Sequence, residues 1–270
     1  MEYFVTSNGI PVHVSETGKG DKAILLLHGY LETLYIWEEF RSLLPESSHI
    51  VSIDLPGMGL TGTDPQINTM QFDAKVVCGV LDKLSVKSVV IVGHSMGGYV
   101  GQRFIKDFPD RIDALVNVNS NPYADDPAKA SDRQKEIDFI LNGKLVQLAQ
   151  IAIPNMYAKA NLRKCDETVI ETVEICETHD PEGVAAVVRG LQCREDNVAL
   201  LNSTSVPVMF VYGDSDVYTP LSKIEKIKSD LPSCRHETVA STGHNTHVED
   251  PAALARLLAD FAVSVNIAGY

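Results

Sequence analysis

The sequence predicts an α/β protein, built on a doubly wound, mostly parallel sheet into which a block of helices is inserted. Short apolar, β-branched runs alternate with segments of helical period up to residue 121, and again over residues 204–270. Such alternation favours a parallel sheet with helices on both faces. Residues 122–203 instead carry helical pieces with no strand of buried type. We therefore expect a core of residues 1–121 and 204–270, capped by residues 122–203 above the carboxyl ends of the strands, where open α/β sheets bind ligands.

The chain opens with a predicted β-hairpin. The alternating runs EYFVTS and IPVHVS flank Asn8-Gly9, a dipeptide typical of a two-residue hairpin turn. The later strands read as apolar throughout, as expected of parallel strands buried on both faces: KAILLLHG, HIVSIDLPG, KSVVIVG, IDALVNVNS, VPVMFVYG and the less apolar RHETVA. Apolar residues at helical spacing predict helices over 70–84, 97–108 and 220–230, and a last helix from Asp250 with Pro251 in its first turn.

The predicted cap consists of helical pieces over 131–150, 166–177 and 181–191. Ser131 and Asp166 are residue types that cap helix N-termini, so we place helix starts there. Gly143 is expected to interrupt the first piece, because glycine destabilises a helix interior.

Composition excludes several classes of partner. The 270 residues include 36 acidic and 23 basic side chains, for a formal net charge of -13, so phosphate backbones and anionic membranes would repel the chain. The N-terminus lacks the basic and apolar regions of a signal peptide, and no apolar run could span a bilayer, so we expect a cytoplasmic protein. No Cys-x-x-Cys pair, other metal-ligand spacing or glycine-rich phosphate loop occurs, which predicts no metal and no cofactor. Nothing in the sequence indicates an oligomeric state.

A serine lies between two glycines where a predicted strand gives way to a helix. Gly93-His94-Ser95-Met96-Gly97 has the form Gly-x-Ser-x-Gly. This pattern places a nucleophile on a strained turn, with glycines where bulkier side chains would clash. A serine that merely caps the helix within a glycine-rich turn is the alternative. The strand before and the helix after favour Ser95 as a nucleophile.

A serine nucleophile needs a base, a group that orients the base, and donors for the oxyanion. Asp214 and Asp216 follow one late strand, and His244 and His247 follow the last one, at the same edge of the sheet as Ser95. The backbone N–H of Met96, at the start of the helix, is one expected oxyanion donor. The backbone N–H of Tyr30, in the loop HGY after the third strand, is the other, and His28 is expected to support that loop.

Six segments, in order, resemble the α/β-hydrolase fold superfamily over essentially the full chain: LLLHGY, DLPGMGLT, GHSMGG, FPDRIDALVNVNS, VYGDSDVYTP and GHNTHVEDP. The resemblance implies a Ser95–Asp216–His244 triad and a helical cap over the pocket, with His247 in a structural or surface role. Haloalkane dehalogenases and epoxide hydrolases of the superfamily have an aspartate nucleophile, so Ser95 argues against both activities.

The function expected is a serine hydrolase that cleaves a small to medium carboxylic ester or lactone through an acyl-enzyme and needs no cofactor. A slow ligand sensor, an acyltransferase or perhydrolase, and a C–C bond hydrolase share the same triad and stay open as alternatives. Candidate pocket residues come from the predicted cap and from the neighbours of the triad in sequence, although simple packing would explain several of them equally well. They are Tyr99, Tyr123, Phe139, Met156, Tyr157 and Val217.

Overall fold

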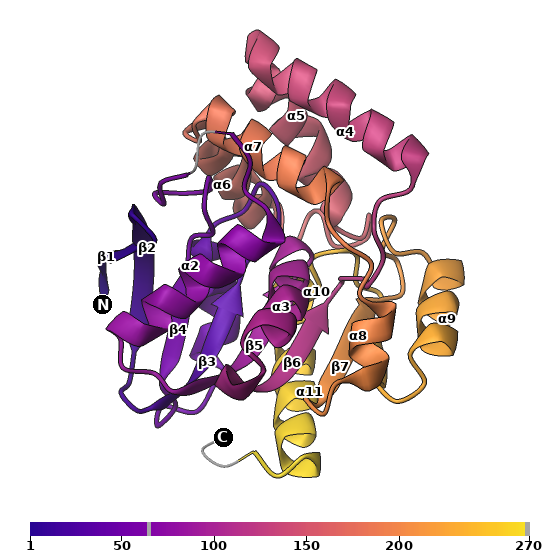
Figure 1. The fold of residues 1–270 in the computed structure, drawn as a ribbon. Coiled ribbons are helices and arrows are strands. Elements are labelled where there is room, and N and C mark those ends of the chain that lie inside the picture. The colour runs from indigo at the N-terminus through magenta and orange to yellow at the C-terminus, as the bar shows by residue number, and fades with distance from the viewer. Residues whose placement is uncertain (64–65, 268–270) are drawn as a thin grey trace.

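A computed structural model describes residues 1–63 and 66–267 of the chain. Its centre is one eight-stranded sheet in the order β1-β2-β4-β3-β5-β6-β7-β8 (Figure 1). The strands are β1 (Glu2–Ser7), β2 (Ile10–Thr17), β3 (Lys22–Leu27), β4 (Ile50–Ile53), β5 (Ser88–His94), β6 (Ile112–Val118), β7 (Val208–Gly213) and β8 (Arg235–Val239).

The N-terminal hairpin is the antiparallel part of this sheet. Asn8 and Gly9 both adopt positive φ, 48° and 83°, the conformation that a type I′ turn requires of its two central residues. β1 pairs with β2, and β2 with β4, in antiparallel register, whereas the pairs from β4 to β8 are parallel. The predicted mostly parallel α/β sheet is therefore confirmed.

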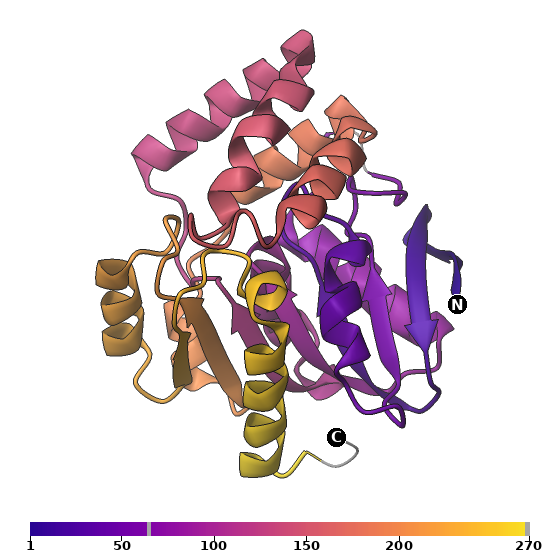
Figure 2. The ribbon, with the colours of Figure 1, turned by 180° about the vertical axis from the view of Figure 1, so that it is seen from behind.

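Helices cover both faces of the sheet. α2 (Met70–Lys83) and α3 (Met96–Asp107) pack together on one face, shown towards the viewer in Figure 1. α1 (Glu38–Ser42) and α11 (Pro251–Ser264) contact each other on the opposite face (Figure 2). The other elements described outside the helical insertion are η1 (Leu34–Trp37), η2 (Pro109–Arg111), α8 (Val198–Ser203), α9 (Leu221–Asp230) and α10 (Thr246–Glu249).

The helical insertion, defined here as α4 to α7, stands above one edge of the sheet in both views (Figures 1 and 2). It is made of α4 (Pro127–Phe139), η3 (Ile140–Lys144), α5 (Leu145–Ala152), η4 (Pro154–Met156), α6 (Asp166–Glu177) and α7 (Pro181–Gln192). Gly143 has a φ of 74° and breaks the first piece as predicted.

Two predicted helix starts are shifted. α4 begins four residues before Ser131, because Pro127 suits the first helical position and the Asp126 side chain accepts from the Lys129 N–H. Asp166 is the first residue of α6, and Cys165 stands at the cap position before it. A carboxylate in the first helical turn is stabilised by the positive end of the helix dipole, although it does not cap the helix.

Apolar side chains fill both interfaces between the sheet and its helices. The bulkiest fully buried side chains include Trp37 and Phe40 on one face and Phe104 on α3. Among residues 1–63 and 66–267, no helix is long and apolar enough to cross a membrane.

Candidate active site

Ser95 lies at the turn between β5 and α3 in a strained backbone conformation, with φ 47° and ψ −107°. Positive φ is rare for a residue with a side chain, and such strain concentrates at functional sites. The turn is tight on both sides of the serine. A Cβ on Gly93 would lie 2.5 Å from the backbone of Gly97, and one on Gly97 would lie 2.2 Å from the carbonyl oxygen of Leu27. The two glycines of the motif therefore allow the close backbone approach that presents Ser95.

His244 and Asp216 meet from the loops after β8 and β7. Nδ1 of His244 lies 2.8 Å from Oδ2 of Asp216, and both side chains are buried. Asn119 donates from Nδ2 to the same carboxylate oxygen over 3.0 Å, and the Tyr218 N–H donates to Oδ1 over 2.7 Å. Of the two candidate aspartates, Asp216 is thus the one hydrogen-bonded to His244.

The side chain of Asp214 forms hydrogen bonds within the neighbouring loops and not with His244. Its Oδ1 accepts hydrogen bonds from the Ser241 N–H over 2.8 Å and from the Ser215 hydroxyl over 2.9 Å. These contacts tie the loop after β7 to the loop after β8.

The Asp216 carboxylate is held in its ionised form. Burial alone would raise its pKa, but the nearby His244 and the hydrogen bonds from His244, Asn119 and Tyr218 outweigh that effect and lower the pKa to about 2. A buried carboxylate in this state accepts the Nδ1–H of His244 and leaves the other ring nitrogen free to act as a base.

A cavity of about 450 Å³ lies between the sheet edge and the helical insertion. Ser95, His244, Met96 and Tyr30 all line it. Within the part of the chain that the structure describes, neither the Tyr30 nor the Met96 backbone N–H has a hydrogen-bond partner. The volume suits a small-molecule ligand.

The side chain of His28 supports the loop that carries Tyr30. The Leu55 N–H donates to Nε2 of His28 over 2.8 Å, and Nδ1 lies 2.7 Å from the Gly29 carbonyl oxygen. His28 is completely buried, and burial lowers its pKa, which favours the neutral ring that these two contacts require. It supports the loop, as the sequence predicted.

Three of the six predicted pocket residues, Tyr99, Met156 and Val217, line the cavity. The predictions for Tyr123, Phe139 and Tyr157 are corrected, since none of them is among its lining residues. The Tyr123 hydroxyl donates to Asp230 over 2.9 Å, which turns it towards α9. The Phe139 ring lies under the Lys144 ammonium at 5.1 Å, and Tyr157 is buried in the hydrophobic core.

Charged side chains also line the cavity, and sequence reasoning missed them. The cations are Lys129, Arg133, Arg194 and Lys223, and the carboxylates are Asp125, Asp126 and Glu136. Asp125 bridges Arg133, at 3.2 Å, and Arg194, at 2.6 Å. Lys223 forms no ion pair with any residue that the structure describes, and burial lowers its pKa. No local motif marks these residues, which come from three separate stretches of the chain.

Glu249 ties the loop of His244 to the chain segment between α5 and α6. Its buried carboxylate accepts from the Gly243 N–H over 2.7 Å and from the Ala158 N–H over 3.0 Å. The Met156 carbonyl oxygen in turn accepts from the His244 N–H over 2.6 Å. The helical insertion therefore helps to position the histidine loop.

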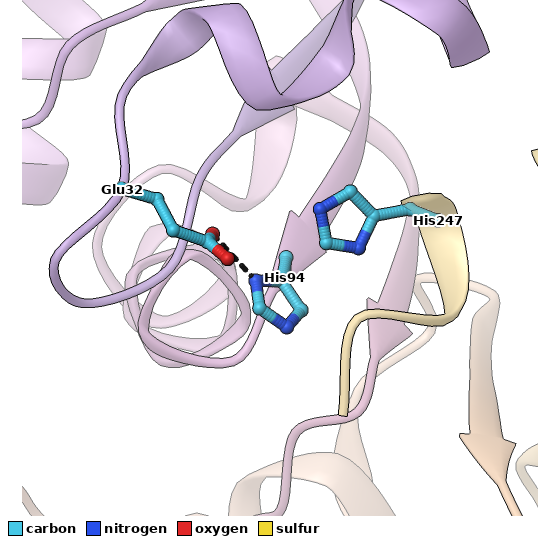
Figure 3. Close-up of side chains that lie close together, drawn as sticks. All are labelled: Glu32, His94 and His247. Atoms are coloured by element: carbon cyan, nitrogen blue, oxygen red, sulfur yellow. Dashed lines mark hydrogen bonds and ion pairs between the residues drawn. The ribbon is translucent and has the colours of Figure 1, made fainter. Parts of the chain in front are cut away.

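Three buried side chains lie close together, one of them next to the nucleophile in sequence: Glu32, His94 and His247 (Figure 3). Each offers a potential metal ligand, and these atoms lie within 4.8 Å of one another. However, Nδ1 of His94 lies 2.8 Å from Oε2 of Glu32, a hydrogen-bond distance. The centroids of the His94 and His247 rings are 4.3 Å apart, and the ring planes are tilted by 42°. Because Nδ1 of His94 already lies at hydrogen-bond distance from the Glu32 carboxylate, the pairing of these two groups fits a shared proton better than a metal ion. His247 is packed against Trp37 at 4.4 Å and is fully buried, so a surface role for it is wrong.

Comparisons with known proteins agree with this architecture. A family model described as the alpha/beta hydrolase fold matches residues 22–251, so the chain belongs to that family. A solved esterase from Thermogutta terrifontis, with malate bound, superposes with a TM-score of 0.90 at 24% identity, covering 98% of this chain and 99% of that one. The enol-lactonase from Burkholderia xenovorans LB400 superposes with a TM-score of 0.88 at 18% identity, covering 97% and 100%. These likenesses show the fold.

A curated relative has a named activity. The 2-hydroxy-6-oxononadienedioate/2-hydroxy-6-oxononatrienedioate hydrolase of Cupriavidus pinatubonensis is 23% identical over 266 residues, which are 93% of this chain and 90% of the relative. The chain is thus a hydrolase of the α/β-hydrolase fold family.

Proposed function

We propose that this protein is a serine hydrolase that cleaves a small to medium carboxylic ester or lactone through an acyl-enzyme. One observation carries the proposal: the strained Ser95 and the Asp216-bound His244 line the same cavity. Nucleophile, base and orienting acid occur together in this arrangement in serine hydrolases on unrelated folds.

The geometry supports a two-step reaction. Ser95 Oγ attacks the acyl carbon while His244 Nε2 takes the hydroxyl proton, and the free N–H groups of Tyr30 and Met96 stabilise the oxyanion. Collapse of the intermediate breaks the bond to the leaving oxygen, which receives the proton from His244. Water then attacks the acyl-enzyme, giving its proton to His244, and the acid is released as Ser95 regains its proton. Asp216 holds the His244 tautomer and stabilises the imidazolium at each step.

The cavity lining supports a polar substrate. Its charged side chains lie on α4 and just before it, on the segment after α7 and at the start of α9. The unpaired ammonium of Lys223 supports a substrate whose acyl or alcohol part carries a carboxylate, because such a group would compensate the partly desolvated cation. The helical insertion would then select the substrate while the sheet edge supplies the reacting groups.

Fluorophosphonate labelling together with a substrate panel tests the proposal. We expect the wild-type protein to be labelled and to hydrolyse members of a panel of neutral esters, carboxylate-bearing esters, lactones and a C–C cleavage substrate. Ser95→Ala should lose both labelling and turnover while retaining its fold by circular dichroism. Full labelling of Ser95→Ala, or a wild-type protein that is neither labelled nor active, would overturn the serine-hydrolase reading. Release of a C–C cleavage product alone would reject the ester or lactone substrate.

A further inference from the structure

The residue before the nucleophile has an unusual set of hydrogen-bond partners. Nδ1 of His94 lies 2.8 Å from the Glu32 carboxylate, and Nε2 lies 3.0 Å from the backbone carbonyl oxygen of His244. Both partners are acceptors, whereas a neutral imidazole has only one N–H to donate. The His94 side chain is 1% exposed and that of Glu32 is 0% exposed. Bulk water therefore does not reach the pair to donate to whichever acceptor the single N–H leaves unpaired.

The hydrogen-bond partners of His94 and Glu32 limit where the protons of this pair can lie. The carbonyl oxygen can only accept, so Nε2 of His94 carries a hydrogen. The remaining proton lies between Nδ1 and Glu32, and the pair as a whole is neutral in either position. The Gly29 N–H also donates to the same Glu32 oxygen over 2.8 Å, which favours the carboxylate form. Burial by itself would raise the pKa of Glu32, but His94, through its charge and hydrogen bond, outweighs it and lowers the pKa to about 2.

The pair connects the three loops on which the proposed reaction depends. Glu32 contacts the Gly29 N–H in the loop that carries Tyr30. His94 immediately precedes Ser95, and it reaches across 150 positions of sequence to the main chain of His244. The rings of His94 and His244 also meet edge to face, with their centroids 5.0 Å apart.

We propose that His94 is a positioning residue: as a buried imidazolium paired with Glu32, it donates to the His244 carbonyl oxygen and fixes the base relative to Ser95 and the oxyanion loop. The inference rests on the proposed function for its catalytic consequence, but not for the protonation state of His94. The ring of His247 packs beside that of His94 at a tilt of 42° and is uncharged, because burial and the charge of His94 both lower its pKa. The His94 imidazolium and the Glu32 carboxylate thus place one positive and one negative charge in contact, and no net charge is buried.

The protonation state is tested by NMR on wild-type protein with ¹⁵N-labelled histidine at pH 7.5. We expect both ring nitrogens of one residue to carry slowly exchanging protons, with signals that disappear in His94→Gln. A ring nitrogen of His94 without a proton would overturn the proposal, whether or not the protein has esterase activity. Stoichiometric zinc, bound to the wild-type protein and lost in Glu32→Gln, would replace the ion pair with a metal site and would also overturn it.

The positioning role is tested with His94→Gln and Glu32→Gln against a matched control. His179→Gln removes another buried histidine, which lies outside the cavity lining. With turnover measured well below each melting temperature, both test variants should lose about 10- to 100-fold in kcat with KM nearly unchanged, because small misplacements of reacting groups cost rates of this order. The control should keep its kcat.

A readout independent of turnover separates this inference from the proposed function. The ring signals of His244 should shift in His94→Gln and Glu32→Gln but not in His179→Gln. Unshifted His244 signals in the two test variants, or unchanged kcat in both, would overturn the positioning role. Shifted signals in a protein without any hydrolase activity would support the positioning role and reject the proposed reaction instead.

Discussion

His244 and Asp216 are joined by a 2.8 Å contact between Nδ1 and Oδ2, whereas Asp214, two residues earlier, contacts Ser241 and Ser215. This difference separates two carboxylates that the sequence places in the same loop. Asp216→Asn should lower kcat by roughly 10⁴-fold, since an amide can hold the wrong histidine tautomer. Asp214→Asn should retain most activity and lose thermal stability, because the Asp214 carboxylate stabilises a turn through its hydrogen bonds. Steady-state kinetics and thermal melts of the two variants check this, and an inactive Asp214→Asn would reverse the assignment.

The strain at Ser95 has a measurable consequence for stability. With φ at 47° and ψ at −107°, alanine keeps the backbone strain and glycine relieves it. Ser95→Gly should therefore be more stable than Ser95→Ala by about 1 kcal/mol in urea unfolding, since strain of this kind costs on the order of 1–3 kcal/mol and the added chain entropy of glycine offsets part of the gain.

Ser222 on α9 provides the control for this comparison. It is exposed in a regular helix, where alanine is favoured over glycine. Ser222→Ala should thus be more stable than Ser222→Gly, the reverse of the order at position 95. The same order at both positions would show that the turn at Ser95 stores no strain.

Much of the fold could be predicted from the sequence, because local patterns report local structure. The continuous apolar run of β5 and the helical period of α2 follow directly from burial on two faces or on one. Asn8-Gly9 specifies its turn through backbone conformations that few other residues adopt. The start of α4 was misplaced because Asp126 and Ser131 are both good caps, and Pro127 favours the earlier one.

The site was harder to predict where it depends on long-range contacts. Gly-x-Ser-x-Gly indicates Ser95 locally, but the contact between His94 and His244 spans 150 positions. Nothing near Lys223 or Arg133 in sequence indicates that both line one cavity. The prediction of Phe139 as a pocket residue depends only on its place in the cap. In the structure, α4 is oriented so that Phe139 does not line the cavity.

The difference between Met156 and Phe139 tests the role of the cavity. Met156 lines it, and Phe139, also in the helical insertion, does not. Met156→Ala should change the ranking of kcat/KM across esters of increasing acyl length while leaving the rate of fluorophosphonate labelling within a few-fold. Phe139→Ala should leave the ranking unchanged. An unchanged ranking in Met156→Ala would show that this side chain only packs.

The last prediction concerns stability towards acid. His179 is 4% exposed, and its burial lowers the pKa of its ring from 6.5 to about 4. The unfolded chain therefore binds a proton at this position at a higher pH than the folded protein does. The contribution of His179 to stability is complete above pH 6.5 and is lost as the pH falls towards 4, by about 3 kcal/mol in total. His179→Gln should show a shallower fall in the free energy of unfolding than the wild type between pH 6.5 and pH 4, and the two slopes should match above pH 7. Denaturant unfolding at a series of pH values measures both slopes, and parallel curves throughout would mean that His179 is not held neutral in the folded protein.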